Sequence, residues 1–300
     1  MDVIKETVSQ QKPEITYSYK PSSPWFMMMK RFKKNKRALI GLYISLFFII
    51  LAILSPWISP YDPFEYNMKA LLEVPSWTHP FGTDQFGRDV LSRIIHGSRI
   101  SLMIGVVGVG ISIVIGVTLG TIAGYFGGLT DSIIMRIMDI LMAFPGFLLA
   151  LAIISILGPS MINVMIAIGI FSIPTFARIM RSSVISIKYK EYIEATKSLG
   201  GSNFFIITKH VVPNCIAPII VLSSMRIATA ILSAAGLSFL GLGAQPPTPE
   251  WGAMLSEGRE FIRSSPHLST FPGLVIMVVA LGFNMLGDGL RDALDPQMKV

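Results

Sequence analysis

The sequence predicts an all-α membrane protein with six transmembrane helices. This prediction rests on composition, on long uncharged apolar segments and on cysteine usage. Of the 300 residues, 52% are hydrophobic and only 14% are charged, whereas soluble domains carry about 25% charged residues. The single cysteine, Cys215, excludes a disulfide within the chain and a Cys-x-x-Cys metal site. Its apolar surroundings predict a small side chain in the core or against lipid.

The first 37 residues are polar and precede the first apolar segment. They contain nine lysines and arginines, and six of these lie within 30–37, directly before the uncharged segment 38–58. A cleavable signal peptide would have an apolar region near its start instead. Positive charge beside a first span is typical of a cytoplasmic terminus. We therefore expect 1–37 to be a cytoplasmic segment and 38–58 to be the first transmembrane helix.

A polar, extracytoplasmic or interfacial segment is expected at 59–101, followed by a five-helix core at 102–296. About 20 apolar residues cross a bilayer, and segment 102–130 is uncharged and contains eight glycines. Five of these glycines recur at helical spacing. Small residues on one face let a second helix approach closely, so we expect packing rather than a solute pathway at Gly105, Gly108, Gly116, Gly120 and Gly124.

The other spans follow from similar segments. Residues 140–177 contain no charge over 38 positions, which is too long for one helix. Gly158-Pro159-Ser160 marks a turn within this segment, because glycine and proline interrupt helices. The third span is therefore expected from about Ser132 and the fourth at about 162–180. The fifth and sixth are expected at about 214–242 and 272–286.

Charge distribution predicts the same orientation as the number of spans. Six spans with an internal N-terminus place both termini in the cytoplasm of a multi-pass cell-membrane protein. Segment 178–209 then lies inside and holds six lysines and arginines, as the positive-inside rule expects. The external segment 59–101 holds four lysines and arginines and five acidic residues. Segment 244–271 holds two basic residues and three acidic ones. The net charge of +7 thus indicates contact with membrane lipid and not with nucleic acid.

A short polar segment between spans four and five predicts a docking element. Residues 191–199 can form a short helix that Gly200-Gly201 would end, because glycine is favoured just past a helix C-terminus. Ser202 can N-cap a second short helix through about Lys209. We expect Pro213 to close this unit and turn the chain into span five. A short helix with charged and apolar faces on a rigid turn suits a groove on another protein.

The spacing Glu194-Ala195-(x4)-Gly200-(x9)-His210-x-Val212-Pro213 resembles the EAA loop of importer-type ABC permeases. The family pattern is Glu-Ala-Ala, a glycine five residues after the central alanine, then Ile-x-Leu-Pro. Thr196, His210 and Val212 depart from it. The resemblance implies a type I importer permease fold with a cytoplasmic coupling helix that docks into an ATP-binding subunit. A generic basic loop is the alternative. The candidate coupling residues are Glu191, Glu194, Ala195, Lys197, Gly200, Gly201, His210 and Pro213.

Three further segments, 79–93, 237–252 and 283–296, resemble dipeptide and oligopeptide permeases, and the N-terminal region with its first span resembles the C-type subunit of that permease pair. An acid common near position 234 in that subfamily is replaced by Ala234. The resemblance implies transport of di- or oligopeptides. Its alternatives are an oligosaccharide, nickel or a nickel–metallophore complex, and glutathione. The implied partners are a homologous permease subunit, two cytoplasmic ATP-binding subunits that carry ATP and magnesium, and an extracytoplasmic solute-binding protein.

Two polar side chains inside the spans are candidates for the pathway or the subunit interface: Arg226 and Asn284. A charge at the bilayer centre costs about 2.5–3.5 kcal/mol on insertion scales, so Arg226 should face a water-filled cavity or a carboxylate or carbonyl of a partner subunit. Both interpretations stay open.

Several polar residues outside the spans are assigned structural roles. His79, Asp84, Asp89 and His96 share no helix face, and we expect Asp84, Arg88 and Asp89 to cap and pair around an amphipathic helix before span two. Residues 250–265 predict a second amphipathic helix on the outer surface.

The motifs that would give this chain its own catalysis are absent. The sequence contains no Gly-x4-Gly-Lys-Ser/Thr phosphate loop, no His-Glu-x-x-His and no Gly-x-Ser-x-Gly. We therefore expect no catalytic residue, no metal site and no cofactor bound by the chain itself. An intramembrane enzyme or a passive channel remains the rival class, although a channel needs no docking loop.

Overall fold

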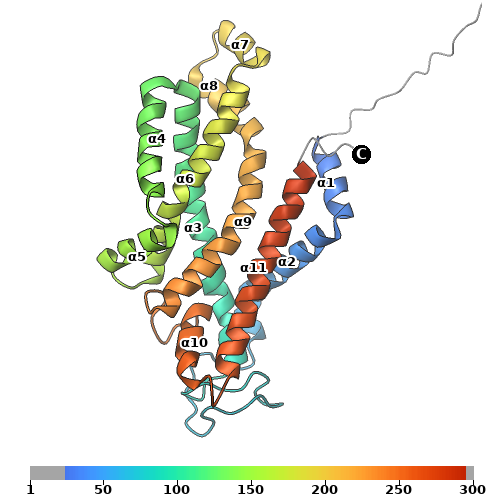
Figure 1. The fold of residues 1–300 in the computed structure, drawn as a ribbon. Helices are drawn as coiled ribbons and strands as arrows, with labels where there is room; N and C mark the ends of the chain where they lie inside the picture. Colours follow the sequence, from blue (N-terminus) through green and yellow to red (C-terminus); the bar gives the residue numbers. More distant parts are fainter. Residues whose placement is uncertain (1–23, 295–300) are drawn as a thin grey trace, which may run out of the picture.

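The computed structural model describes residues 24–294 and consists of helices joined mainly by short connections (Figure 1). One long irregular segment, 59–89, interrupts this pattern, and the only β pairing within the described residues is an isolated bridge between Thr83 and Asp89. The predicted cytoplasmic segment is covered only from residue 24. The helices are α1 Pro24–Lys34, α2 Lys36–Ile58, α3 Val90–Phe126, α4 Gly128–Met142, α5 Gly146–Leu157, α6 Met161–Lys188, α7 Glu191–Ser198, α8 Asn203–Ile206, α9 Val212–Phe239, α10 Trp251–Gly258 and α11 His267–Leu294.

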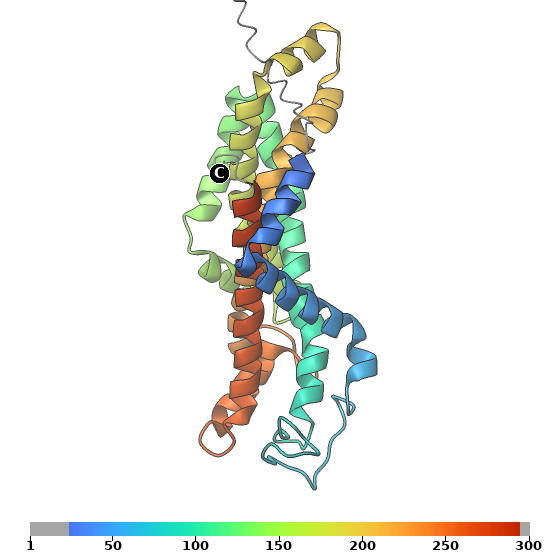
Figure 2. The ribbon, with the colours of Figure 1, turned by 90° about the vertical axis from the view of Figure 1, so that its right-hand side faces the viewer.

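The long helices run alternately up and down between two ends of the molecule. In Figure 1, α1, α7, α8 and the C-terminal end of α11 lie at one end, called here the α7 end. The segment 59–89 and α10 lie at the other, the α10 end. Figure 2 shows α1 and α2 against α11 on the outside of the bundle. The first described helix, α1, and the C-terminal end of the last, α11, thus lie at the same end.

Five helices in residues 24–294 are long and apolar enough to cross a membrane, and α4 with α5 makes a sixth crossing if this bent pair counts as one span. The bend between them is 87°. Sequence analysis predicted one continuous third span here and missed the break. Its cause is Pro145, which lacks an N–H for the helix ladder and disfavours helical geometry in Phe144 before it. The predicted turn at Gly158–Ser160 is confirmed, because α5 ends at Leu157 and α6 begins at Met161.

The glycine-rich face of α3 packs closely against its neighbours, as predicted. A Cβ atom added to Gly116 would lie 2.7 Å from the Cβ of Phe176 on α6, and one added to Gly108 would lie 2.9 Å from Ile168 Cγ2. Gly120 contacts the Ala177 backbone. These contacts make α3 and α6 the most closely packed pair of helices. Larger side chains at these positions would force the two backbones apart.

The second span begins 12 residues earlier than predicted, and no separate amphipathic helix precedes it. Asp89 is the N-cap of α3 itself and accepts a 2.7 Å hydrogen bond from the Ser92 backbone N–H. The predicted start at Leu102 was wrong because polar side chains at the start of α3 were assigned to the surface. In the structure they are buried: Arg93 is 1% exposed and Ser92 fully buried.

The predicted amphipathic surface helix at 250–265 is also wrong. The structure has α10 at Trp251–Gly258, followed by a 3₁₀ turn at Arg259–Phe261. Trp251 is fully buried and donates its indole N–H to the Ile94 carbonyl at 3.0 Å. The Glu250 side chain, 1% exposed, caps the helix through the Gly252 and Ala253 N–H groups. This helix therefore packs into the bundle instead of lying on it.

Candidate functional site at the α7 end

Helix α7 is the projecting element at its end of the molecule (Figure 1). It spans Glu191–Ser198, as predicted to within one residue, and its acids Glu191 and Glu194 lie in the first turn while Lys197 lies in the last. This order complements the partial charges of the helix ends. Ile193, 4% exposed, is its buried anchor and belongs to the main hydrophobic core. The helix is thus fixed on one side and open on the other.

A glycine turn ends α7 in a defined geometry. Gly200 has φ +85°, which an L side chain rarely adopts. The Gly201 N–H donates to the Thr196 carbonyl at 3.0 Å, and the Gly200 N–H donates to the Lys197 carbonyl at 3.0 Å. This pair of bonds is the Schellman motif, which satisfies carbonyls that a helix end leaves free. Gly201 is also restricted by space, because an added Cβ would lie 2.8 Å from the Thr196 carbonyl oxygen.

The second short helix forms as predicted, but it does not end at Pro213. Ser202 caps α8, its side chain accepting from the Phe205 N–H at 3.3 Å. A π-helical turn, Ile207–Val211, then joins α8 to α9 without a break, so one helix runs over Asn203–Phe239. The expectation that Pro213 turns the chain was wrong. A proline ring displaces the carbonyl four residues earlier, and the wider π turn lies where that carbonyl, of Lys209, must be accommodated.

Side chains of this segment tie it to the rest of the bundle. Ile206 and Val211, both fully buried, join the same core as Ile193. The Tyr125 hydroxyl near the end of α3 donates to Asn203 Oδ1 at 2.9 Å. His210 is partly buried and lies with its ring 5.5 Å from that of Phe205. This polar replacement of the family isoleucine is therefore accommodated at a ring edge.

The open side of the segment carries large apolar side chains that sequence analysis overlooked. Leu199 is 89% exposed, Phe204 78% and Tyr189 70%. Exposed aromatic and aliphatic side chains on a polar loop are typical of a protein interface. We call Tyr189, Leu199 and Phe204 the α7 apolar face.

The predicted coupling residues divide into two groups by exposure. Glu191, Glu194, Ala195, Lys197 and Gly200 are exposed, and the structure brings them together on α7 and its C-terminal turn. The remaining three have structural roles or lie at the edge of that surface. They are Gly201 in the helix-ending turn, His210 in the π turn, and the exposed Pro213 at the start of α9.

Two charges that the sequence placed in the same loop lie elsewhere. Helix α6 continues to Lys188, so Arg178 and Arg181 are helical residues. Arg178 pairs with Asp139 on α4 at 2.6 Å, and Arg181 forms a bidentate pair with Asp131. These ion pairs hold α4 against α6, so neither arginine belongs to the loop that contains α7.

The two candidates within the spans are not brought together by any contact. Arg226 on α9 is partly buried and donates one hydrogen bond, 2.8 Å long, to the Thr175 hydroxyl on α6. Asn284 is partly buried on α11, and its side chain makes no hydrogen bond within residues 24–294. Cys215 is fully buried, which confirms the predicted small core side chain.

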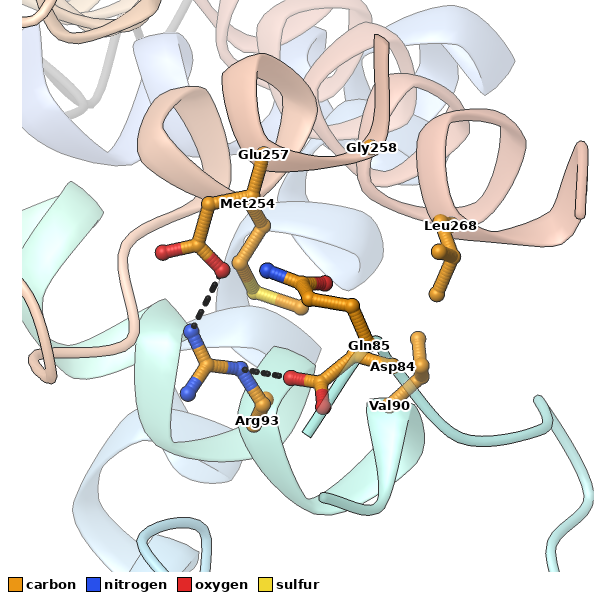
Figure 3. Close-up of a pocket in the computed structure, with 8 residues that line it drawn as sticks. All are labelled: Asp84, Gln85, Val90, Arg93, Met254, Glu257, Gly258 and Leu268. Atoms are coloured by element: carbon orange, nitrogen blue, oxygen red, sulfur yellow. Dashed lines mark hydrogen bonds and ion pairs between the residues drawn. The ribbon is translucent and has the colours of Figure 1, made fainter. Parts of the chain in front are cut away.

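The polar residues at the α10 end form a buried ion-pair network. The Arg88 side chain donates to Asp84 at 2.7 Å and to Glu257 of α10 at 3.1 Å. Figure 3 shows Arg93 between the same two carboxylates, at 3.3 Å from Glu257 and 3.6 Å from Asp84. His79 contacts Asp89 at 2.9 Å. Within residues 24–294 no group of three metal-ligating side chains occurs. The predicted pairing of Asp84 with Arg88 is confirmed, and these side chains join segment 59–89 to α10.

Comparison with known protein families matches two segments of the chain. The family described as "Binding-protein-dependent transport system inner membrane component" matches residues 116–300. The family described as "N-terminal TM domain of oligopeptide transport permease C" matches residues 23–75. The chain belongs to the binding-protein-dependent transport system inner membrane components: it is a multi-pass membrane subunit of an ABC importer and not an enzyme.

Individual relatives are similar over nearly their full lengths. The dipeptide transport system permease protein DppC of Alkalihalophilus pseudofirmus is 51% identical over 293 residues, which cover 98% of this chain and 96% of that protein. The glutathione transport system permease protein GsiD of Pectobacterium atrosepticum is 47% identical over 278 residues, or 92% of each chain. A chain of the inward-facing MetNI methionine ABC transporter superposes with a TM-score of 0.55 at 16% identity, over 68% of this chain and 97% of that one. That similarity establishes the fold.

Proposed function

We propose that this chain is one half of the membrane pathway of an importer for di- or oligopeptides. The observation that carries this proposal is the 51% identity to a dipeptide permease over 98% of the chain. The resemblance of three segments around α3, α10 and α11 to peptide permeases supports it independently of the coupling loop. A homologous permease subunit would complete the pathway, and an extracytoplasmic solute-binding protein would deliver the peptide at the α10 end.

Energy enters at the α7 end in this proposal. Helix α7 and the α7 apolar face dock into a cleft on one of the two cytoplasmic ATP-binding subunits, and the homologous permease subunit docks into the other. The exposed Glu194 and Lys197 supply polar contacts around the apolar centre formed by Leu199 and Phe204. ATP and magnesium are bound by the ATP-binding subunits, and this chain binds no cofactor. The arrangement supports docking because interfaces combine an apolar centre with a polar rim.

The connections of α7 support transmission of motion from the ATP-binding subunits to the membrane helices. α7 lies between the end of α6 and the start of the continuous helix Asn203–Phe239. Its Schellman turn and its buried Ile193 fix it to both neighbours. Movement of α7 therefore moves two spanning helices together. Rocking of such helices between inward-open and outward-open states is the mechanism of alternating access.

The orientation in this proposal places the α7 end in the cytoplasm. Six crossings, with α4 and α5 together as the third, then leave both termini in the cytoplasm as well. The cluster of basic residues 30–37 beside α2 supports this orientation. It also puts the buried ion-pair network of the α10 end on the extracytoplasmic side.

Glutathione is the second candidate solute. Relatives named as glutathione permeases are 47–48% identical over 92% of this chain, close to the value for the dipeptide permease. Both solutes are small peptides with a free carboxylate, so the fold alone does not separate them.

Uptake by the assembled transporter tests the proposal. The permease pair, the ATP-binding subunits and the binding protein are reconstituted in liposomes, and ATP-dependent import of a labelled dipeptide is measured in competition with glutathione. We expect dipeptide import that unlabelled dipeptides suppress and glutathione does not. Import of glutathione without import of dipeptides would show that glutathione, and not a dipeptide, is the solute. Import of neither would overturn the proposed function.

A further inference from the structure

Arg226 is a cation in the membrane without an anionic partner among residues 24–294. It is the only charged residue of α9. Within residues 24–294 it forms no ion pair, and its one hydrogen bond is to the neutral hydroxyl of Thr175. A guanidinium has five N–H donors in a rigid fork. The side chain is thus oriented by its neighbour but not neutralised, and most of its donors remain available.

The position of this pair is at mid-depth. α6 and α9 each contain 28 residues, and Thr175 and Arg226 are each the fifteenth. The two helices run in opposite directions, so the hydrogen bond joins the middle residues of α6 and of α9, where α9 is the part of the continuous helix that follows the π turn. Ionisable groups at the middle of spans are costly and mark solute or ion pathways. In transporters the solute sites lie near the bilayer midplane.

An open apolar groove begins one helical turn from this pair. Leu222, four residues before Arg226, and Ile179, four residues after Thr175, both line it, and both lie on the α7 side of the pair. The groove has a volume of about 410 Å³, within the usual size of small-ligand sites. Arg291 of α11 places a cation in the groove wall, and Arg226 itself lies one turn outside that wall. The remaining wall residues are apolar: Ala217, Pro218, Val221, Met225 and Leu294.

We propose that Arg226 binds a carboxylate of the translocated peptide at mid-membrane, and that the groove toward Arg291 accepts the peptide's side chains on its way to the α7 end. This inference rests on the proposed function and names the chemistry of its pathway. A planar guanidinium suits a carboxylate because two parallel N–H···O bonds form at once. Thr175 is a positioning residue, because its hydroxyl accepts a hydrogen bond from the guanidinium and orients it. The apolar wall can contact peptide side chains of different kinds, and it has no group that would select one of them.

The test compares a dipeptide with its C-terminal amide, which differs only in the carboxylate. Import of both is measured in the reconstituted transporter containing either wild-type chain or Arg226→Gln, with the same binding protein, so that discrimination by the binding protein cancels. One charge-assisted contact is equivalent to about 10-fold or more in preference. We expect the acid-to-amide ratio of import to fall about 10-fold in Arg226→Gln. The fall in the ratio should be smaller in Arg226→Lys. Arg263 is an exposed cation at the α10 end, and Arg263→Gln should leave the ratio unchanged.

A second variant separates positioning from charge. Thr175→Val keeps Arg226 and removes only the hydroxyl, so we expect a smaller fall in the ratio, about threefold, with unchanged co-purification of the permease pair. An unchanged ratio in both Arg226→Gln and Thr175→Val would overturn the inference. So would loss of the permease pair in Arg226→Gln that is restored by replacing a carboxylate of the partner with an amide, because Arg226 would then be an interface residue.

Failure of the proposed function gives a different result. If the wild-type transporter imports glutathione and not dipeptides, the proposed solute is wrong, but glutathione and its glycine amide then provide the same comparison for Arg226. A wild-type transporter that imports only solutes lacking a carboxylate overturns both proposals.

Discussion

The two ends of the molecule place their charged residues in opposite ways. At the α10 end the charges are buried, with Arg88 and Arg93 each 1% exposed and held between Asp84 and Glu257. At the α7 end the charges of α7 are exposed, and so are the large apolar side chains Leu199 and Phe204. A buried, paired network fixes local geometry, whereas an exposed apolar face needs a second surface to cover it. The network at the α10 end is therefore satisfied within the chain, whereas no part of residues 24–294 covers the α7 apolar face.

The largest effect is expected from opening the buried network. Arg88→Met leaves the carboxylates of Asp84 and Glu257 short of one cation, and removing one partner of a buried ion pair costs about 3–5 kcal/mol. We expect thermal unfolding of the detergent-solubilised permease pair at a clearly lower temperature. Lys69→Met, which removes an exposed lysine of the same segment, is the matched control. Equal unfolding temperatures for both variants would show that the network does not stabilise this end.

A charge on the α7 apolar face should affect binding and not stability. In Phe204→Asp a side chain that is 78% exposed is replaced, so the unfolding temperature should stay within about 1 °C, because surface substitutions cost less than about 0.5 kcal/mol. Loss of an interface hot spot costs about 2 kcal/mol or more, so co-purification of the ATP-binding subunits should fall more than 10-fold. Thr208→Asp, an exposed residue of the π turn, is the control. Retention of the ATP-binding subunits by Phe204→Asp would remove this face from the docking site.

The turn after α7 should show an effect of about 1 kcal/mol. Gly200 has φ +85°, and no atom would contact an added Cβ, so Gly200→Ala introduces backbone strain alone. Left-handed geometry costs an L residue about 1–2 kcal/mol. We expect ATPase activity stimulated by the binding protein to fall several-fold in Gly200→Ala and less in Gly200→Asn, because asparagine tolerates this geometry better. Equal activity in all three proteins would mean that α7 does not need this turn.

The smallest effect tests how firmly the α7 end is tied to α3. Tyr125→Phe removes the hydrogen bond to Asn203 and nothing else. A single partly exposed hydrogen bond contributes about 0.5–1.5 kcal/mol. We expect amide hydrogen exchange in 203–211 to become a few-fold faster with no change in α6. An exchange rate that does not change would indicate that the buried Ile206 and Val211 hold this segment alone.

The fold could be predicted from sequence wherever the cause was local. Uncharged length identified the spans, glycine spacing identified the face between α3 and α6, and Gly200 with Ser202 identified the boundary between α7 and α8. The misses occurred where a residue's role depended on distant contacts. Arg93 and Trp251 look like surface residues in sequence, but Glu257 and the Ile94 carbonyl satisfy their polar groups in the interior.

The motif residues of the candidate site were predicted from the sequence, but its exposed apolar residues were not. Glu194, Gly200 and Pro213 have motif spacing, so their positions could be read directly. The α7 apolar face could not, because apolar residues next to spans look like continuations of those spans. The π turn before Pro213 was missed for a related reason: proline usually ends a helix, and only the widened turn allows α9 to continue through it.

The two longest helices give the transporter clearance on both sides of the bilayer. α3 and the continuous helix Asn203–Phe239 each contain 37 residues, which corresponds to about 55 Å at 1.5 Å per residue. The hydrocarbon layer is only about 30 Å thick. The excess of about 25 Å is greater than the roughly 10–15 Å that the two headgroup layers add. Proteins on either side can thus meet the permease in water, and neither the energy-supplying nor the cargo-delivering encounter requires a partner to press into lipid.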